Sequence, residues 1–238
     1  MTFNKKEEVM AATLVDTVQT TYTQQQLTKS FIEAWFVLYN EAPQKSSIAV
    51  LWAQNALETG QAAFMWNNNI GNVKFVANAA DTPDIEYCML KNVWEVINGQ
   101  KVYFQPPDPA TWFRSFRTLK DGVAFQFDFL KNKRYKSAWT AVEAGDPADF
   151  SHKLRLQGYY TAPEADYTRA VVGYFNSFMN SSSFEISLQE VLAEQTATPA
   201  PVPVTPPPVV TPSPIPETLG FWESLIRIIQ LFFGARRN

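Results

Sequence analysis

The sequence predicts an α+β fold in which a helical body carries a small β lobe, and three observations support this. Apolar residues recur every three or four positions in residues 25–59 and again in residues 119–180. Between these stretches, residues 72–118 alternate apolar and polar side chains and contain many β-forming and turn residues. The pair Asn98–Gly99 separates two of these runs, which is a strong hairpin signal. Helices and strands in separate stretches of one chain are typical of α+β folds.

The periodicity also sets the order of the helices. They are expected at residues 25–40 and 46–59, across 119–180 with breaks at 145–147 and 158–163, and at 184–193. On the second helix, Leu51, Gln54, Asn55 and Glu58 share one side. Residues 1–24 are expected to be weakly helical. We therefore divide the chain into this N-terminal segment and a domain covering residues 25–195.

The composition changes abruptly near residue 196. Nine of the eighteen residues in 199–216 are Pro, which removes most of the backbone donors that helices and sheets need. Residues 196–216 are therefore expected to form an extended polyproline linker, with residues 199–216 spanning roughly 55 Å at about 3.1 Å per residue.

Residues 217–238 have a different character and are expected to form an amphipathic anchor helix. Phe221, Leu225, Ile228 and Phe232 recur at helical spacing, and the opposite side carries polar and charged residues. The apolar stretch is short for a membrane span and carries charge. Docking on a membrane surface or a partner such as a virion protein is therefore favoured. A short span, or a helix that folds back on the domain, stays open.

The composition disfavours several kinds of partner and site. The net charge is −3 with both signs interspersed, so no nucleic-acid partner is expected. A single Cys (Cys88) and a single His (His152) leave no disulfide framework and no ordinary Cys/His zinc site, and no cofactor is expected. A nucleophilic Cys88–His152 pair is disfavoured, because nothing marks Cys88 as opening a helix; a small core residue is expected there, and a surface residue at His152. Carboxylates remain as candidates for hydrolysis.

Two further features bear on substrate and location. The chain has seven Trp, nine Tyr and eighteen Phe, a number that suits a sugar-binding surface as well as a core. The first residues do not have the pattern of a secretory signal, because Lys5 and Lys6 are followed at once by Glu7 and Glu8.

The most informative motif is Asn55-Ala56-Leu57-Glu58-Thr59-Gly60, followed by Trp66-Asn67-Asn68-Asn69-Ile70-Gly71-Asn72-Val73-Lys74. It predicts a helix that ends on a carboxylate, stops at a glycine and continues into an asparagine-rich loop. A Glu in the last turn of a helix lies at the negative end of the macrodipole, which disfavours ionisation. If apolar groups also shield Glu58, its pKa rises toward the range in which it can protonate a leaving group, as the acid of a glycosidase does.

Four stretches resemble the glucosaminidase family of bacterial and phage cell-wall hydrolases (glycoside hydrolase family 73), within the lysozyme-like superfamily. They cover about residues 25–180 in the family's order. The stretches are Ala56 to Gly60; Asn68 to Lys74; Trp94 to Val102 with Trp112-Phe113-Arg114-Ser115-Phe116; and Asn132 to Tyr135 with Asp146-Pro147, Phe150 and Leu156 to Pro163. The chain departs from the family in the long acidic stretch 76–92 and in Ala162, where an Asp is common.

The resemblance implies a lysozyme-like fold and assigns roles. Glu58 matches the catalytic acid, and Glu95 the second carboxylate on the first hairpin strand; Asp81, Asp84 and Glu86 compete for that second role. Tyr159 matches the family's substrate-binding tyrosine. Trp66, Asn69 and Tyr160 are further candidates for binding sugar, whereas Trp112 is expected in the core.

The expected function is therefore cleavage of the GlcNAc–MurNAc backbone of peptidoglycan, by a glucosaminidase or a lysozyme-like hydrolase. Linker and anchor favour a virion-associated lytic enzyme; a bacterial cell-envelope enzyme is the alternative. Three other outcomes stay open: a lytic transglycosylase that gives anhydro-MurNAc, a module that binds glycan without cutting it, and membrane permeabilisation by residues 217–238.

Overall fold

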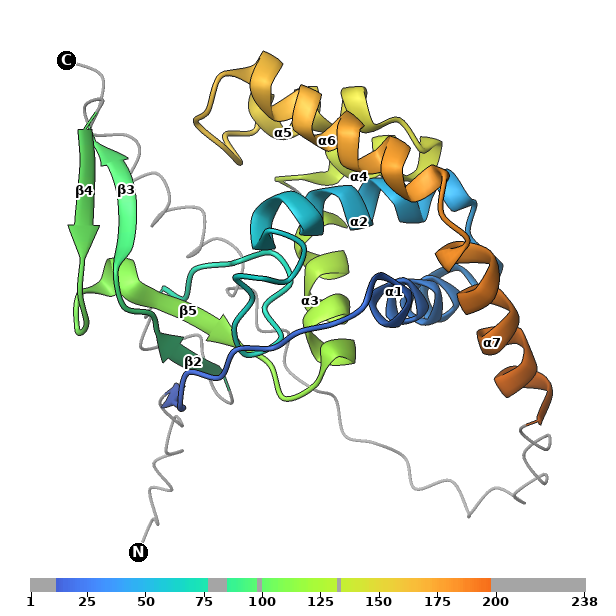
Figure 1. Ribbon diagram of the computed structural model, residues 1–238, viewed down its shortest axis with the longest axis horizontal. Coiled ribbons are helices and arrows are strands. Elements are labelled where there is room, and N and C mark those ends of the chain that lie inside the picture. The colour runs from blue at the N-terminus through green and yellow to red at the C-terminus, as the bar shows by residue number, and fades with distance from the viewer. Residues whose placement is uncertain (1–11, 77–84, 98–99, 132–133, 198–238) are drawn as a thin grey trace, which may run out of the picture.

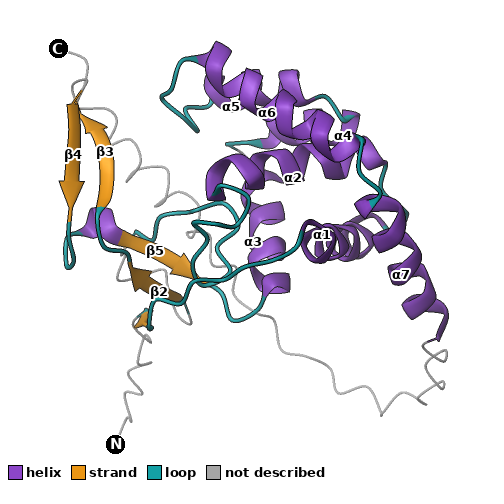
Figure 2. Ribbon diagram, viewed as in Figure 1, coloured by secondary structure: helices purple, strands orange, loops and turns teal. Residues whose placement is uncertain are grey.

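The structure is a computed structural model and describes residues 12–76, 85–97, 100–131 and 134–197. In this part of the chain a body of seven α-helices lies beside a lobe of short strands, which confirms the α+β fold class (Figures 1 and 2). The α-helices are α1 (Gln24–Tyr39), α2 (Lys45–Thr59), α3 (Leu119–Lys131), α4 (Lys136–Ala144), α5 (Pro147–Leu156), α6 (Glu164–Met179) and α7 (Ser183–Ala197). The strands are β1 (Thr13–Leu14), β2 (Glu86–Met89), β3 (Val93–Ile97), β4 (Gln100–Phe104) and β5 (Trp112–Ser115), with a 3₁₀ turn at Pro109–Thr111.

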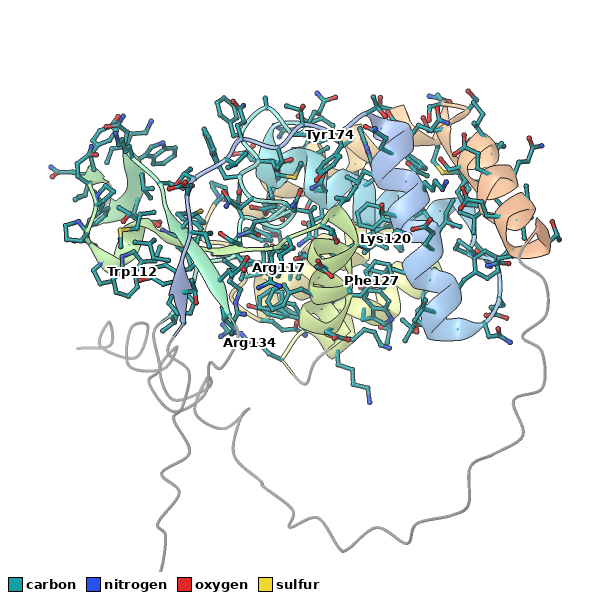
Figure 3. All side chains as sticks on the ribbon, turned by 90° about the horizontal axis from the view of Figure 1, so that it is seen from below. Trp112, Arg117, Lys120, Phe127, Arg134 and Tyr174 are labelled. Carbon is teal, nitrogen blue, oxygen red and sulfur yellow. The ribbon has the colours of Figure 1, made fainter. Side chains whose placement is uncertain are left out.

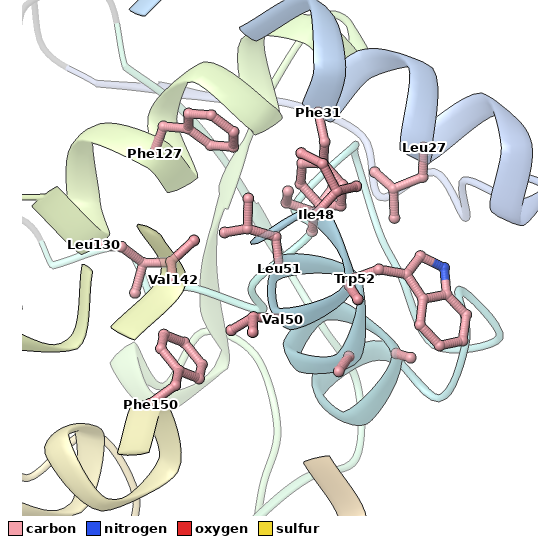
Figure 4. Packing of buried hydrophobic residues seen from close by; sticks show 14 of the residues in the cluster. Leu27, Phe31, Ile48, Val50, Leu51, Trp52, Phe127, Leu130, Val142 and Phe150 are labelled. Atoms are coloured by element: carbon pink, nitrogen blue, oxygen red, sulfur yellow. The ribbon is translucent and has the colours of Figure 1, made fainter. Parts of the chain in front are cut away.

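Helix α2 forms the centre of the body. Buried residues occupy its whole circumference from Ser47 to Ala56, and it packs against α1, α4 and α6. Its side chains Ile48, Val50 and Leu51 meet Phe31 of α1 and Phe150 of α5 in one continuous core (Figure 4). A helix buried all round has few positions left for polar groups, and in α2 they lie at the two ends: Lys45 to Ser47 at the start, and Gln54, Asn55, Glu58 and Thr59 in the last turns.

The predicted helices agree with the structure to within a few residues. The breaks at residues 145–147 and 158–163 are confirmed, since α4 ends before Gly145 and α5 ends at Leu156. A further break between α3 and α4 was not predicted, and Asn132 and Lys133 there lie outside the described residues. The last helix, α7, extends farther at its C-terminal end than the predicted 184–193.

The β lobe consists of two separate sheets. One has the order β1–β2–β5, with β1 parallel and β5 antiparallel to β2. The other is the hairpin β3–β4, in which Ile97 lies opposite Gln100. This register confirms the two-residue connection, although Asn98 and Gly99 themselves lie outside the described residues.

The β lobe has its own small core. Cys88 is fully buried, as predicted. Trp112, expected in the core, is half-buried; its ring packs against Phe75 and Tyr87, and Figure 3 shows it on the strand side of the molecule, away from Phe127 of α3.

The prediction of a weak helix in residues 1–24 is wrong for its described part. Residues 12–23 are extended: β1 pairs with β2, and the following residues pass over the asparagine-rich loop before α1 begins. The backbone N–H of Thr20 donates to Met65 and that of Asn67 to Val18. These partners, distant in sequence, supply the hydrogen bonds that a short isolated helix would have to find within itself.

The predicted linker and anchor, residues 196–216 and 217–238, lie almost wholly outside the described residues. Among the helices that the structure does describe, none combines the length and apolarity needed to cross a membrane.

Two helical glycines make a matched test of this packing. A Cβ at Gly122 of α3 would lie 2.1 Å from the backbone carbonyl oxygen of Asn68, whereas a Cβ at Gly173 of α6 would meet nothing within 4 Å. Gly122→Ala should therefore force α3 away from the loop and lower the free energy of unfolding by about 1–3 kcal/mol. Gly173→Ala should raise it by roughly 0.5–1 kcal/mol, through helix propensity alone. Urea unfolding of both variants measures the difference; equal effects would contradict the close approach of α3 to the loop.

Candidate active site

Glu58 lies in the last turn of α2, one residue before the helix ends. Gly60 adopts the left-handed conformation, with φ of +57°, and closes the helix as predicted. The Thr59 hydroxyl donates to the carbonyl oxygen of Asn55 at 2.7 Å and accepts from the N–H of Ala62 at 3.0 Å. The end of α2 is thus fixed on both sides of Glu58.

The asparagine-rich loop is bonded to this helix end. Asn72 donates its side-chain amide to the carbonyl oxygen of Glu58, and Asn55 donates to the carbonyl oxygen of Ile70 at 2.6 Å. The last carbonyls of a helix have no partner within the helix, so the Asn72 bond uses one of these free acceptors. Loop and helix therefore hold each other in place around Glu58.

Asn69 is buried within the loop, and its side chain bonds the backbone there. Its amide N–H₂ donates to the carbonyl oxygens of Val73 at 2.9 Å and Arg114 at 3.0 Å, and its oxygen accepts from the N–H of Val73. The residue is 2% exposed. This arrangement favours a structural role for Asn69 over the predicted contact with sugar.

Trp66, also predicted to bind sugar, is half-buried, and its backbone pairs with Gln19.

The carboxyl of Glu58 is surrounded by protein, although the residue keeps some exposure to solvent. Burial raises its pKa to about 7. The hydroxyl of Tyr167 on α6 donates to Oε1 of Glu58 at 3.0 Å, and this bond lowers the pKa by a smaller amount because it favours the charged form. Near neutral pH the group therefore exists in both protonation states.

Tyr167 is itself held by Tyr160. Their rings stack at 3.7 Å between centroids with an angle of 6° between the planes. The Tyr160 hydroxyl bonds to Ser151 of α5, which also bonds to Thr168. Tyr160 is 9% exposed, so the structure favours a role in positioning Tyr167 over the predicted direct contact with sugar.

Tyr159 lies close enough to Glu58 for its pKa to respond. Burial raises the pKa of the Tyr159 hydroxyl well above its usual range, and the charge of Glu58 adds to this. Gln126 and Gln54 act in the opposite direction through hydrogen bonds. Tyr159 thus places a neutral hydroxyl near Glu58, and the residue is half-buried.

Glu95 is an exposed carboxylate on β3 that forms an ion pair with Lys74, 2.9 Å from Oε1 to Nζ. Of its competitors, Glu86 pairs with Arg117 at 2.8 Å, and Asp81 and Asp84 lie outside the described residues. The hairpin that carries Glu95 stands apart from the helices (Figure 2). Glu58 and Glu95 are therefore supported by different parts of the fold.

Cys88 and His152 do not come together. Cys88 is buried in β2, where burial raises the pKa of its thiol, and His152 lies on α5 with Nδ1 2.8 Å from the carboxylate of exposed Glu164. Within the described ranges, no group of three His, Cys, Asp or Glu residues is placed to hold a metal ion.

The residue that sequence reasoning missed is Tyr167. It is 109 positions from its partner Glu58, and no local spacing links the two. The only available signal is that Tyr167 falls in the first turns of a helix that follows Pro163 and the tyrosine pair Tyr159–Tyr160.

No family model matches the chain, and no curated protein matches it. Among solved structures, the chain is similar to the glycoside hydrolase domain of FlgJ from Salmonella typhimurium, at 16% identity over 74% of this chain and 99% of that one, with a TM-score of 0.42. It is also similar to a peptidoglycan hydrolase mutant from Sphingomonas sp. A1, at 21% identity over 68% and 99% of the two chains, with a TM-score of 0.41. The catalytic domain of the autolysin Auto from Listeria monocytogenes matches at 19% identity over 71% and 90%, with a TM-score of 0.41.

These solved structures are of the same class, peptidoglycan hydrolases and other glycoside hydrolase domains, as the family that the sequence motifs resemble. Identities and TM-scores this low assign no activity and no residue roles to the chain.

Proposed function

We propose that this protein cleaves the GlcNAc–MurNAc backbone of peptidoglycan, with Glu58 as the general acid. The observation that carries the proposal is the state of Glu58. Its carboxyl is surrounded by protein yet reached by solvent, and burial raises its pKa to about 7. A glycosidase needs a carboxylic acid that is still protonated at the working pH.

In the proposed step, protonated Glu58 donates its proton to the glycosidic oxygen while the bond from that oxygen to the anomeric carbon breaks. The bonding electron pair leaves with the oxygen, and the anomeric carbon develops oxocarbenium character. Glu58 then carries the negative charge, and the Tyr167 hydroxyl at 3.0 Å stabilises that charge. The tyrosine thus favours the form of the acid that exists after proton transfer.

The second half of the reaction has two candidate routes. Glu95 can activate a water that attacks the anomeric carbon, or the substrate's own N-acetyl or hydroxyl group can attack. The second route gives the alternative function, a lytic transglycosylase that forms anhydro-MurNAc. Glu95 is exposed and paired with Lys74, so a route that needs only one protein acid remains a full alternative.

The proposed location is a virus particle, with the cell wall as the site of action and a bacterial cell envelope as the alternative. The proline-rich segment would supply reach, and residues 217–238 would attach the protein to a membrane surface or a virion protein.

Glu58→Gln should abolish release of glycan fragments from purified peptidoglycan, with a rate loss of roughly 100-fold or more, because Gln has no proton to give. Mass spectrometry of the products identifies the bond: reducing GlcNAc means a glucosaminidase, reducing MurNAc a muramidase, and anhydro-MurNAc a transglycosylase. Glu95→Gln measured in parallel should be inactive only if Glu95 is the second carboxylate. Glu164→Gln, on the exposed start of α6, is the control. Binding without any cleavage by the wild type would overturn the proposal.

The pH profile should test the acid directly. Since Glu58 must be protonated, activity should fall as pH rises through about 7. Tyr167→Phe removes a hydrogen bond to the charged form, so it should raise the pKa of Glu58 and move the alkaline limb of kcat to higher pH. Tyr174→Phe removes a hydroxyl from the same helix and should leave the limb in place. An alkaline limb that does not move in Tyr167→Phe would exclude Glu58 as the group that titrates.

The same burial should make the charged form of Glu58 lower the free energy of unfolding. Its pKa is raised from 4.5 to about 7, so the folded state loses stability as pH rises through this range. Neutral Gln avoids the loss: Glu58→Gln should match the wild type at pH 4 and exceed it at pH 8 by up to about 3 kcal/mol. Chemical unfolding at the two pH values measures this. If the stability difference between Glu58→Gln and the wild type were the same at pH 4 and pH 8, the carboxyl would be better solvated than its surroundings indicate.

A further inference from the structure

Arg114 on β5 is a cation that has no carboxylate partner among the described residues. Its guanidinium lies over the ring of Phe125, 4.7 Å from the centroid, and burial lowers its pKa. In the described part of the chain no carboxylate and no hydrogen-bond acceptor contacts this guanidinium. The other four arginines there all have an oxygen partner: Arg117 with Glu86, Arg134 with the carbonyl of Gln157, Arg155 with the carbonyl of Tyr160, and Arg169 with Asp166.

Burying an unpaired guanidinium costs free energy unless a counter-ion or hydrogen-bond acceptors replace the lost water. A guanidinium that is largely withdrawn from water loses hydration, and an aromatic ring on one face replaces only part of it. Its five N–H donors form a planar fork that matches the two oxygens of a carboxylate. Arg114 is half-buried rather than sealed in the core, so an anion from solution has access to it.

The backbone of Arg114 is held firmly beside the proposed active site. Its N–H donates to the carbonyl oxygen of Val73 at 3.0 Å, and its carbonyl accepts from the Asn69 amide at 3.0 Å. The same asparagine-rich loop bonds the end of α2 through Asn72. Arg114 is therefore positioned by the loop that also positions Glu58.

A row of partly open aromatic rings connects Arg114 with the surroundings of Glu58. Phe125 and Phe129 lie one turn apart on α3, with ring centroids 5.8 Å apart. Phe129 contacts Tyr159 edge-on at 6.4 Å, and Tyr159 responds to the charge of Glu58. All three rings are half-buried. Rings of this kind pack against the apolar faces of sugars, so the row offers a path for a glycan strand.

We propose that Arg114 binds a carboxylate of the substrate, while the glycan strand lies along Phe125, Phe129 and Tyr159 with its cleaved bond at Glu58. The proposal rests on the proposed function. Two sources supply this chemistry: the free carboxylates of the stem peptides, and the lactyl carboxylate of MurNAc in strands whose peptides have been removed. Either makes Arg114 the residue that selects an acidic strand over a neutral one.

The test compares kcat/KM of the full chain on four substrates. They are intact peptidoglycan, strands freed of stem peptides, peptidoglycan whose carboxylates have been converted to methylamides, and a neutral chitin oligosaccharide. Arg114→Gln should lower kcat/KM about tenfold or more on the carboxylate-bearing substrates and leave it nearly unchanged on the two neutral ones. A loss confined to intact peptidoglycan identifies the stem carboxylates, and a loss on peptide-free strands identifies the lactyl group.

Two matched variants make the result specific. Arg117→Gln removes the same charge three residues away, from an exposed arginine that pairs with Glu86, and should keep the wild-type preference. Arg114→Lys keeps the charge without the planar fork and should restore part of the preference. Unchanged activity on the neutral substrates shows that Arg114→Gln folds, and thermal unfolding checks it independently.

An equal loss on all four substrates, or the same loss in Arg117→Gln, would overturn the assignment of Arg114 while leaving the proposed function intact. If the wild type cleaves none of the four, the proposed function fails as well.

Discussion

The structure around the candidate site depends on the asparagine-rich loop and the end of α2 holding each other. Asn72 bonds the carbonyl of Glu58, and Asn55 bonds the carbonyl of Ile70. Three other elements then dock on the same loop. The extended N-terminal segment bonds it through Val18 and Thr20, β5 bonds it through Asn69, and α3 approaches it so closely that only a glycine fits at position 122. The junction between the two lobes is therefore built on backbone carbonyls and side-chain amides, whose hydrogen bonds fix geometry without adding charge near Glu58.

Because no charge adjoins the Glu58 carboxyl among the described residues, burial has the largest effect on its pKa. Among the described residues, the polar contact of the Glu58 carboxyl is a neutral hydroxyl, from Tyr167, and the adjoining tyrosine and glutamines are also neutral. A cation at this distance would stabilise the carboxylate and pull its pKa down. Two basic side chains near the β lobe pair with carboxylates other than Glu58: Lys74 with Glu95 and Arg117 with Glu86. The fold thus holds the Glu58 carboxyl, buried and without an ion-pair partner among the described residues, at the end of α2, at a cost in stability above the ordinary pKa of a carboxylic acid.

Periodicity predicted the helices because each long helix buries one apolar stripe against α2 or α1. The spacing of apolar residues within the helix itself reveals that stripe. The turn pair Asn98–Gly99 predicted the hairpin, and Gly60 predicted the end of α2 beside Glu58. Periodicity was wrong for residues 12–23, whose conformation is set by partners some fifty to seventy positions away, such as Met65 and Tyr87. It missed Tyr167 and the isolation of Arg114 for the same reason. Whether an arginine has a partner depends on side chains from β5 and α3 that approach each other only in the folded chain. Tyr160 and Asn69 were predicted to bind sugar, and their burial favours a role in supporting a neighbour.

The ion pair of Glu95 with Lys74 bears on how the two carboxylates work together. Lys74 is held on one side by the carbonyl of Ala110 and lies over the ring of Phe113, so the cation belongs to the sheet that contains β5. Glu95 belongs to the separate hairpin β3–β4. The pair therefore ties the hairpin to the rest of the β lobe, and a Glu95 that activates water must do so while paired or must first leave Lys74. Glu58 differs from it, because burial raises the pKa of Glu58 to about 7 and its carboxyl bonds a neutral hydroxyl rather than a cation. The two carboxyl groups thus have different surroundings, one paired with a cation and one bonded to a neutral hydroxyl, and environments that differ in this way separate the pKa values that acid and base roles need.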